Sequence, residues 1–449
     1  MGLLQNIAAV IVVLGLLITI HEFGHFWVAR RCGVRVLRFS VGFGKPLYKR
    51  YDRHGTEFVL AAVPLGGYVK MLDEREGEVD PAEQHRAFNR KSVYQRIAIV
   101  IAGPLANFIL AVVAYWIMFM VGTTTLVPVV GDVAPGSPAE RGGLTEGEEI
   151  VAIDGRETAS WNDVNLALVA EIGASGTLAF TTRNAQGQVS HHALPVERFM
   201  VRQNPPAPLE TLGFTPWRPA AEPIIGRVLD ESPAARGGLE SGDRILAIDG
   251  EPVSQWESLV TRVRAAPETP LAFHIERDGR RETLEITPSR SEQSESPTGY
   301  IGAAATPASW PEEYQRTLSW GPFGAIGQAL EHTGEMTALT VGSIGKMITG
   351  LISPSNLSGP ITIARIAGDS ARSGLETFIS FLAYLSISLG VLNLMPIPVL
   401  DGGHLVYYLI EAVRGRPVSE RVQMIGLRIG VVMIVSLMLM AFYFDIMRL

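Results

Sequence analysis

Two histidines and a glutamate near the start of the chain have the spacing of a metal-binding helix. His21, Glu22 and His25 form the pattern HExxH. On a helix, residues four apart lie on one face, so His21 and His25 can offer ring nitrogens to the same zinc ion. Glu22 is then adjacent to the metal, where its carboxylate can take a proton from water. The pattern therefore predicts a hydrolytic zinc site.

The apolar surroundings of this motif strengthen the prediction. HExxH occurs by chance in long proteins, and the alternative is a pair of buried, hydrogen-bonded histidines. Here the motif lies within the apolar run 12–29, where ionisable groups are costly and usually functional. We interpret residues 4–29 as a first transmembrane helix with the histidines towards its far end. No basic segment or small-residue cleavage motif precedes the motif, so we expect this helix to be retained.

A candidate third ligand lies close to the other end of the chain, in NLMPIPVLDGGH at residues 393–404. Pro396 and Pro398 cannot continue a helix, and open backbone at membrane depth is tolerated only in protein or beside a cavity. Asp401 follows this break at the predicted depth of His25. A catalytic zinc takes three protein ligands and keeps one open position. Asp401 could instead cap the next helix, and His404 is the alternative ligand. We favour Asp401, which is nearer the break.

Composition places the chain among membrane proteins. It has 449 residues, of which 47% are hydrophobic, too many and too apolar for one soluble domain. The net charge of −7 implies no general affinity for nucleic acid. A single cysteine, Cys32, excludes an internal disulfide and a cysteine-based zinc cluster.

Three further apolar segments, at residues 97–121, 378–399 and 425–443, are predicted to span the membrane. Residues 30–96 are rich in Lys and Arg, so this loop is predicted to be cytoplasmic and the N-terminus external. The active site then lies towards the cytoplasmic side, and residues 122–375 lie outside. In the second span Asn107 has two readings, an interhelical hydrogen bond or a role beside the site.

Alternating, β-rich patterns at residues 34–44 and 56–72 predict short strands and hairpins in the basic loop. Gly66 and Gly67 permit a turn or a close backbone approach there.

An internal repeat occupies the external region. The segments beginning at Val129 and Ile224 match without gaps at an offset of 95 residues, which indicates two copies of one domain. Their sequence resembles PDZ domains, in the order of the circularly permuted bacterial kind. Such domains bind peptide C-termini by strand addition beside a short apolar–Gly–apolar segment. The candidates are Leu212, Gly213 and Phe214 in the first copy, and Ile301, Gly302 and Ala303 in the second; the alternative is that they are ordinary strand residues.

The motifs HEFGH, AGPLAN and NLMPIPVLDGG, together with the tandem PDZ-like domains, resemble the site-2 protease family of intramembrane zinc metalloproteases. The resemblance covers essentially the whole chain. It implies one Zn2+ per chain, held by His21, His25 and Asp401, with Glu22 as the catalytic base. It also implies a contact between Asn393 and the substrate backbone. The hairpin around Gly66, Gly67 and Tyr68 is expected to pair with an unwound substrate strand.

The expected fold is a polytopic α-helical membrane protein with four transmembrane helices, two tandem periplasmic PDZ-like α+β domains and a membrane-associated β-hairpin region. Residues 1–121 and 376–449 are the expected halves of the protease domain. Residues 122–220 and 221–308 are the two PDZ-like domains, and 309–375 are expected to form amphipathic helices at the membrane surface.

The resemblance implies an inner-membrane enzyme of a Gram-negative bacterium that acts in the envelope stress response. Its substrates would be single-span proteins already trimmed on the periplasmic side, such as an anti-sigma factor, with the PDZ pair excluding bulky domains. Two alternatives are a membrane-anchored scaffold with a structural metal, and a transporter. The spans show no inverted repeat and few other polar residues, which disfavours the transporter.

Overall fold

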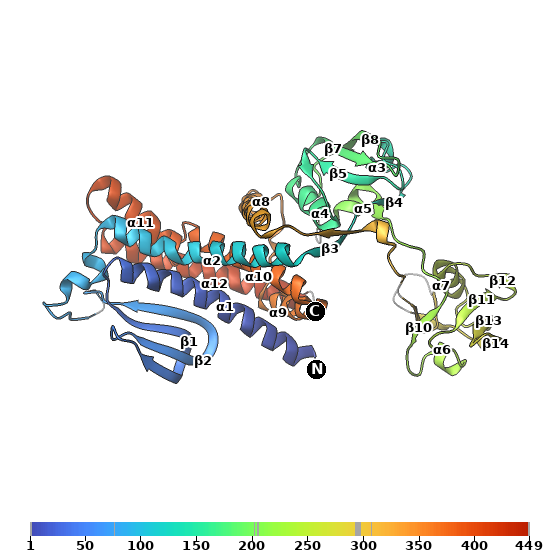
Figure 1. Cartoon of the computed structure of the whole chain (residues 1–449), viewed down its shortest axis with the longest axis horizontal. Coiled ribbons are helices and arrows are strands. Elements are labelled where there is room, and N and C mark those ends of the chain that lie inside the picture. The colour runs from blue at the N-terminus through green and yellow to red at the C-terminus, as the bar shows by residue number, and fades with distance from the viewer. Residues whose placement is uncertain are drawn as a thin grey trace.

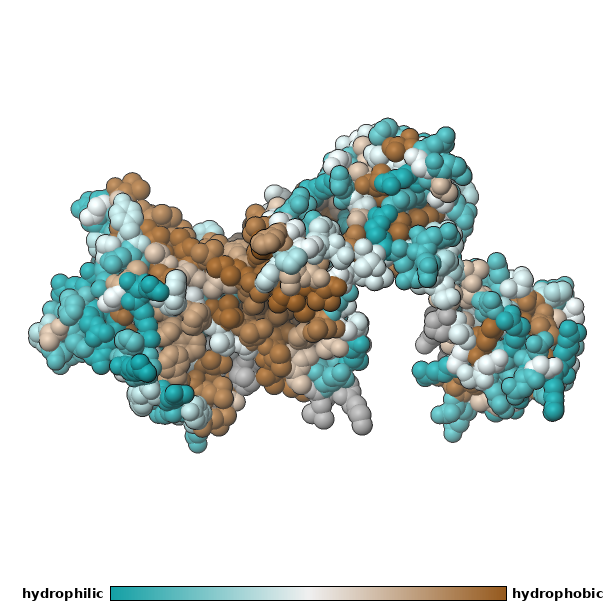
Figure 2. Space-filling view, viewed as in Figure 1, coloured by the Kyte–Doolittle hydropathy of each residue, from teal (hydrophilic) through white to brown (hydrophobic). Residues whose placement is uncertain are grey.

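Four long apolar helices form the body of the protein. The computed structural model describes residues 2–75, 77–201, 203, 206–291, 298–306 and 308–447. The helices are α1 (Gly2–Arg31), α2 (Val93–Val121), α10 (Leu375–Leu394) and α12 (Glu420–Met447). Within the described residues, these four helices are the ones long and apolar enough to cross a membrane, as many as the sequence predicted. They run roughly parallel in Figure 1. α2 packs against both α1 and α10, and α12 packs against α9 (Pro360–Ser373). The region that they occupy is the apolar band in Figure 2.

The third of these helices ends earlier than the sequence suggested. We expected a span to residue 399, but α10 stops at Leu394. Pro396 and Pro398 follow in a short turn, and the chain then re-enters a helix, α11 (Asp401–Arg414), where a loop was expected. A Cβ atom on Gly402 would lie 2.1 Å from the carbonyl oxygen of Met395. Glycine at this position therefore allows α11 to pack directly on the broken segment.

The basic loop contains two long strands, β1 (Val36–Tyr51) and β2 (Glu57–Met71), rather than the short strands expected. They fold on themselves, because Val41 has both Gly67 and Leu60 as register partners. Among the described residues, segment 67–71 pairs only with β1, so its other side is an edge. The hairpin lies along α1 (Figure 1). The short helices η1 (Gln84–Arg86) and η2 (Phe88–Arg90) lead into α2.

The repeated segments fold into two domains that each contain a four-stranded sheet. The first comprises β4 (Val130–Val133), α3 (Pro138–Arg141), β5 (Glu149–Ile153), β6 (Arg156–Glu157), α4 (Trp161–Ala170), β7 (Gly176–Arg183), β8 (Val189–Val196), α5 (Pro208–Leu212) and β9 (Phe214–Pro216). The second comprises β10 (Ile225–Val228), α6 (Pro233–Arg236), β11 (Arg244–Ile248), β12 (Glu251–Pro252), α7 (Trp256–Ala265), β13 (Leu271–Arg277), β14 (Arg280–Ile286), β15 (Ser289–Ser291), β16 (Thr298–Tyr300) and β17 (Ala303–Ala305). Their four-stranded sheets have the orders β6-β5-β7-β8 and β12-β11-β13-β14. The domains differ in the segment that follows the sheet, which is helix α5 in the first and the strand pair β15-β16 in the second.

Matching residues produce matching local structure in the two copies. Ser137 and Ser232 cap α3 and α6, each with its hydroxyl accepting a hydrogen bond from a backbone N–H in the first turn. A proline follows each serine at the first helical position, where it costs no hydrogen bond. Ile150 in β5 and Ile245 in β11 are both fully buried in their own cores. Each copy therefore has a complete core of its own.

The remaining segments tie the first repeat to the helices. β3 (Thr123–Leu126) pairs with β18 (Gln315–Leu318), which follows η3 (Glu312–Tyr314). The expectation of helix from residue 309 was wrong at this point, because these residues complete a two-stranded sheet. Helices α8 (Pro322–Ile348) and α9 (Pro360–Ser373) follow, with η4 (Pro354–Asn356) between them. α8 packs on α2 and α10. Both termini lie at the end of the helical body that faces the two domains (Figure 1).

Candidate metal centre

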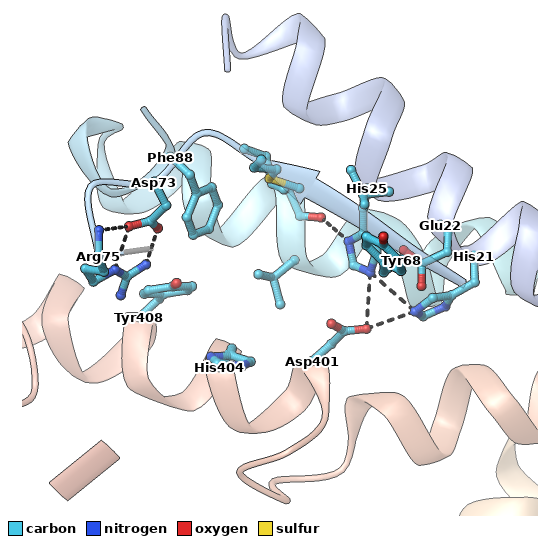
Figure 3. Close-up of a pocket in the computed structure, with 14 residues that line it drawn as sticks. His21, Glu22, His25, Tyr68, Asp73, Arg75, Phe88, Asp401, His404 and Tyr408 are labelled. Atoms are coloured by element: carbon cyan, nitrogen blue, oxygen red, sulfur yellow. Dashed lines mark hydrogen bonds and ion pairs between the residues drawn. The ribbon is translucent and has the colours of Figure 1, made fainter. Parts of the chain in front are cut away.

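His21 and His25 lie one turn apart on the face of α1 that packs against α2. Their Nε2 atoms are 3.3 Å apart, and both residues are less than 10% exposed. Helical spacing accounts for this pairing, because residues four apart project from the same face. The apolar helix thus presents two imidazole rings inside the body of the protein (Figure 3).

Asp401 reaches the two histidines from the first residue of α11. Its Oδ2 atom lies 3.2 Å from Nε2 of His21 and 3.4 Å from Nε2 of His25. The break after α10 turns the chain back on itself, and α11 then aims its first side chain at α1 (Figure 3). Within the described residues, these three form the only His, Cys, Asp and Glu group close enough to share a metal ion.

The spacing of these three atoms fits a tetrahedral zinc ion. Zn–N and Zn–O bonds of about 2.0–2.1 Å with tetrahedral angles place ligand atoms about 3.3 Å apart. The three observed separations, 3.2, 3.3 and 3.4 Å, match this value. Two imidazoles and one carboxylate are also a usual ligand set of catalytic zinc sites.

Hydrogen bonding to α2 orients His25 for ligation. Nδ1 of His25 lies 2.8 Å from the backbone carbonyl oxygen of Ile99. A carbonyl only accepts, so Nδ1 carries the hydrogen and Nε2 presents a lone pair. That lone pair faces the Oδ2 atom of Asp401, which is also an acceptor. A cation placed between two hydrogen-bond acceptors that face each other in this way stabilises both.

Small residues on α2 and α1 make this close packing possible. A Cβ atom on Gly103 would lie 2.2 Å from Nε2 of His25, and one on Gly24 would lie 2.2 Å from the carbonyl oxygen of Ala102. The helices approach each other through these two glycines. Pro104 follows Gly103 and removes the backbone hydrogen bond to Val100, which loosens the turn facing His25.

A cavity of about 360 Å3 opens beside the three candidate ligands. Glu22 lies in its wall next to both histidines, as the motif predicted (Figure 3). The cavity lining comprises His21, Glu22, His25, Tyr68, Val69, Met71, Asp73, Arg75, Phe88, Ile99, Val100, Asp401, His404 and Tyr408. His404 is therefore in the cavity but outside the three-residue group.

The edge of β2 forms one wall of the cavity. Tyr68 lines it, and Gly67 packs on Glu22, with room for no larger residue because a Cβ atom would lie 2.8 Å from the carbonyl oxygen of Ser40. Gly66 is held at a φ of 151° against the ring of Phe43. The structure thus places this predicted segment beside Glu22.

The backbone N–H groups of this edge point alternately towards β1 and towards the opposite side. The N–H of Leu72 donates to the carbonyl of Arg35, on the side of β1. The N–H of Val69 points the other way and interacts with the carboxylate of Glu22. Because alternate residues of a strand point to opposite sides, the N–H groups of Gly67 and Met71 also point away from β1, and Met71 lines the cavity.

Other predicted residues lie outside the cavity. Asn393 is in the last turn of α10, half-buried, and does not line it. Leu212, Phe214 and Ile301 are buried in the repeat cores. Ala303 pairs with β10 in the second repeat.

The two glycines of these segments sit in tight turns. Gly213 and Gly302 adopt φ values of 81° and 74°, and they pack closely on Ser137 and Ser232, respectively. A core and turn role accounts for these contacts, and peptide binding at these segments stays a prediction.

The end of the cavity away from His21 contains residues that the sequence did not single out (Figure 3). The backbone N–H and the guanidinium of Arg75 donate three hydrogen bonds to Asp73, of 2.9, 2.9 and 2.5 Å. Burial would raise the pKa of Asp73, but these bonds hold it below its ordinary value. The ring of Tyr408 also lines this end. No sequence motif marks Asp73, Arg75 or Tyr408. Ile99 also has no sequence signal, because it contacts His25 through a backbone carbonyl that any residue supplies.

Comparison with known proteins identifies a matching family and several full-length relatives. The model of peptidase family M50 matches residues 9–437. The regulator of sigma-E protease RseP of Salmonella typhimurium is 46% identical over 449 residues, and that of Escherichia coli K12 is 45% identical, each covering 100% of both chains. A Vibrio cholerae protein provisionally named a zinc metalloprotease is 42% identical over 449 residues, covering 100% of this chain and 99% of its own.

Among solved structures, the PDZ domain of the SdrC-like protein from Listeria innocua is 20% identical. The match covers 19% of this chain and 92% of that domain, with a TM-score of 0.17. The family model spans nearly the whole chain, and relatives more than 40% identical align with it from end to end. On these grounds the chain belongs to peptidase family M50, the site-2 family of membrane metalloproteases.

Proposed function

We propose that this chain is a zinc-dependent intramembrane endopeptidase that uses His21, His25 and Asp401 to hold one zinc ion and Glu22 as catalytic base. The observation that carries the proposal is the convergence of three ligand atoms at 3.2–3.4 Å, beside a glutamate and a cavity. The names of the relatives, which include a zinc metalloprotease, support the choice of metal.

The chemistry that a bound zinc supplies is polarisation of the scissile carbonyl and a lowered pKa of water. The carboxylate of Glu22 takes one proton from the attacking water. As the C–N bond breaks, Glu22 returns that proton to the leaving amine, so the carboxylate ends the cycle unchanged. The buried histidines and Asp401 remain fixed throughout, because α1, α2 and α11 pack around them.

The edge of β2 is proposed to hold the substrate in an extended form. A transmembrane helix hides its carbonyls in hydrogen bonds, so cleavage requires local unwinding. The N–H groups of Gly67 and Met71 point away from β1 and can replace some of the lost hydrogen bonds, whereas that of Val69 interacts with Glu22. We also propose that Asn393 contacts the substrate backbone, from its place in the last turn of α10.

We propose an inner-membrane location with the metal centre towards the cytoplasm and both PDZ-like domains in the periplasm. The basic loop between α1 and α2 supports this orientation. Both repeats lie beyond the opposite end of the helices (Figure 1), with polar surfaces (Figure 2). The domain limits proposed from the sequence are residues 121, 220, 308 and 375.

The relatives named regulators of sigma-E protease support a role in the envelope stress response. We propose that the substrates are single-span proteins already trimmed on the periplasmic side, such as an anti-sigma factor. The PDZ pair would exclude bulky domains, and one or both copies would bind peptide C-termini. No role with nucleic acid is proposed.

The test is cleavage of a purified single-span substrate in proteoliposomes, together with zinc analysis. Glu22→Gln is expected to keep zinc and abolish cleavage, because the amide cannot take a proton from water. Glu376→Gln makes the same change in the first turn of α10 and serves as the matched control that keeps activity. Cleavage by Glu22→Gln would refute the proposed role of Glu22, whereas a wild-type protein that binds zinc without cleaving would favour the scaffold alternative, in which the metal is structural.

A further inference from the structure

Helix α2 carries a second set of contacts that matches the spacing of the two histidines. Ile99 and Gly103 lie against His25, and Asn107 lies against His21. Gly103 and Asn107 are one turn apart, as are His25 and His21 on α1. Each ring therefore meets its own partner on α2.

Asn107 is fully buried, and its side chain is directed at His21. Its Nδ2 atom lies 3.1 Å from Nδ1 of His21. Its Oδ1 atom is buried without a hydrogen-bond partner, one of two such side-chain atoms in the described part of the chain. Buried polar atoms are nearly always paired, so an unpaired one beside a functional group calls for an explanation.

The partners of His21 and His25 on α2 differ in which imidazole tautomer they allow. The carbonyl of Ile99 only accepts, so it fixes the hydrogen of His25 on Nδ1. An asparagine amide can either donate or accept. With Nδ2 towards His21, the imidazole carries its hydrogen on Nε2 and donates it to Asp401, 3.2 Å away. With Oδ1 towards His21, the hydrogen moves to Nδ1 and Nε2 presents a lone pair to the site.

We propose that Asn107 is a positioning residue that sets the tautomer of His21, with Oδ1 accepting from Nδ1 when a metal is bound. This inference rests on the proposed function. This role explains why Oδ1 has no hydrogen-bond partner. With Nδ2 facing His21, the amide suits His21 as a hydrogen-bond donor to Asp401, and Oδ1 is left free. A half-turn of the amide pairs Oδ1 and readies Nε2 as a ligand.

The backbone of Asn107 is anchored independently of its side chain. The hydroxyl of Ser386, on α10, donates a 2.7 Å hydrogen bond to the carbonyl oxygen of Asn107. Both residues are fully buried. Ser386 thus ties α2 to α10 without touching His21, which separates helix packing from ligand orientation and provides a control.

The experiment measures the zinc dissociation constant of the full-length protein by competition with a chelator, for wild type, Asn107→Leu, Asn107→Asp and Ser386→Ala. Loss of a hydrogen bond that orients a metal ligand typically weakens binding about 10–100-fold. We expect that loss in Asn107→Leu. Asn107→Asp keeps an acceptor for Nδ1–H and should bind zinc at least as tightly as wild type, and Ser386→Ala should bind normally. The Co2+-substituted proteins should show a changed d–d spectrum only in Asn107→Leu.

Wild-type zinc affinity in Asn107→Leu would overturn the inference. An equal loss of zinc affinity in Asn107→Asp would also overturn it. Aspartate has the shape of asparagine but only acceptor atoms, so this variant tests the acceptor role even if the leucine variant misfolds. An equal loss in Ser386→Ala would show that helix packing, rather than His21 orientation, controls the site. Failure of the wild-type protein to bind zinc would instead refute the proposed function, so the two failures are distinguishable.

Discussion

Oδ2 of Asp401 lies 3.2 Å from Nε2 of His21, although the two residues come from opposite ends of the chain. The contact exists because α2 packs against α1 on one side and α10 on the other. The turn after α10 then brings the first residue of α11 back to α1. The two halves of the candidate metal centre are therefore joined by helix packing.

The ligand assignment predicts different effects for two neighbouring residues of α11. Asp401→Ala removes one of three converging ligand atoms and should lower zinc affinity more than about 100-fold. His404→Ala alters the cavity wall but leaves all three atoms in place, so zinc content should be unchanged. Metal analysis of the purified proteins checks both, and the reverse result would make His404 the third ligand.

The close approach of α1 and α2 predicts that a single methyl group disrupts the centre. In Gly103→Ala the new Cβ would lie 2.2 Å from Nε2 of His25. His25 is buried and cannot move aside, so zinc affinity should fall at least about tenfold. Gly15→Ala is the control on α1, because nothing lies within 4 Å of its added Cβ. Equal zinc binding by both variants would show that the helices are not held this tightly.

The direction of the β2 edge predicts which backbone donors matter for cleavage. Met71→Pro removes an N–H that points away from β1 and spares the hydrogen bonds to β1. Losing one hydrogen bond of about 1 kcal/mol should slow cleavage about fivefold. Met71→Ala removes the same side chain but keeps the N–H, and it is the reference for the comparison. Equal rates in the two variants would argue against strand pairing at this position.

An ion pair in the second repeat predicts a local loss of stability in acid. Asp243 is 1% exposed, and its two oxygens accept hydrogen bonds of 2.6 and 2.7 Å from Arg277. Burial would raise the pKa of Asp243, but the bonds from Arg277 bring it below its ordinary value of 3.8. The stabilisation is complete above that value and is lost as the pH falls through the lowered folded-state pKa.

Hydrogen exchange of β11 and β13 in the full-length protein, from about pH 5 to about pH 3, measures this loss after correction for intrinsic exchange rates. Arg277→Leu leaves Asp243 buried without its partner and should destabilise the repeat by about 3–5 kcal/mol near neutral pH. Asp243→Asn should reduce the part of the repeat's stability that is lost in acid. Asp230→Asn, at an exposed position, should behave as wild type; an unchanged acid response in Asp243→Asn would contradict the assignment.

Local sequence determined much of the protein. Apolar length predicts the four spans, because the hydrocarbon core sets how many residues must be apolar. The 95-residue offset predicts the two repeats, because equal residues in equal order bury equal cores. HExxH predicts the placement of two imidazoles on one face, since helical periodicity is a local property.

Only the tertiary structure decided which groups complete the centre. The sequence favoured Asp401 as the third ligand, but its contact with the histidines, rather than that of His404, follows from packing between α1 and α11. The carbonyl of Ile99, Gly103 and Asn107 likewise meet the histidines through packing of α2, which no local pattern encodes. The same holds for the β2 edge, whose outward N–H groups depend on register with β1, and for β18, which is a strand only because β3 is its partner. A carbonyl or an edge N–H has no residue type, so its role becomes visible only when the chain has folded around it.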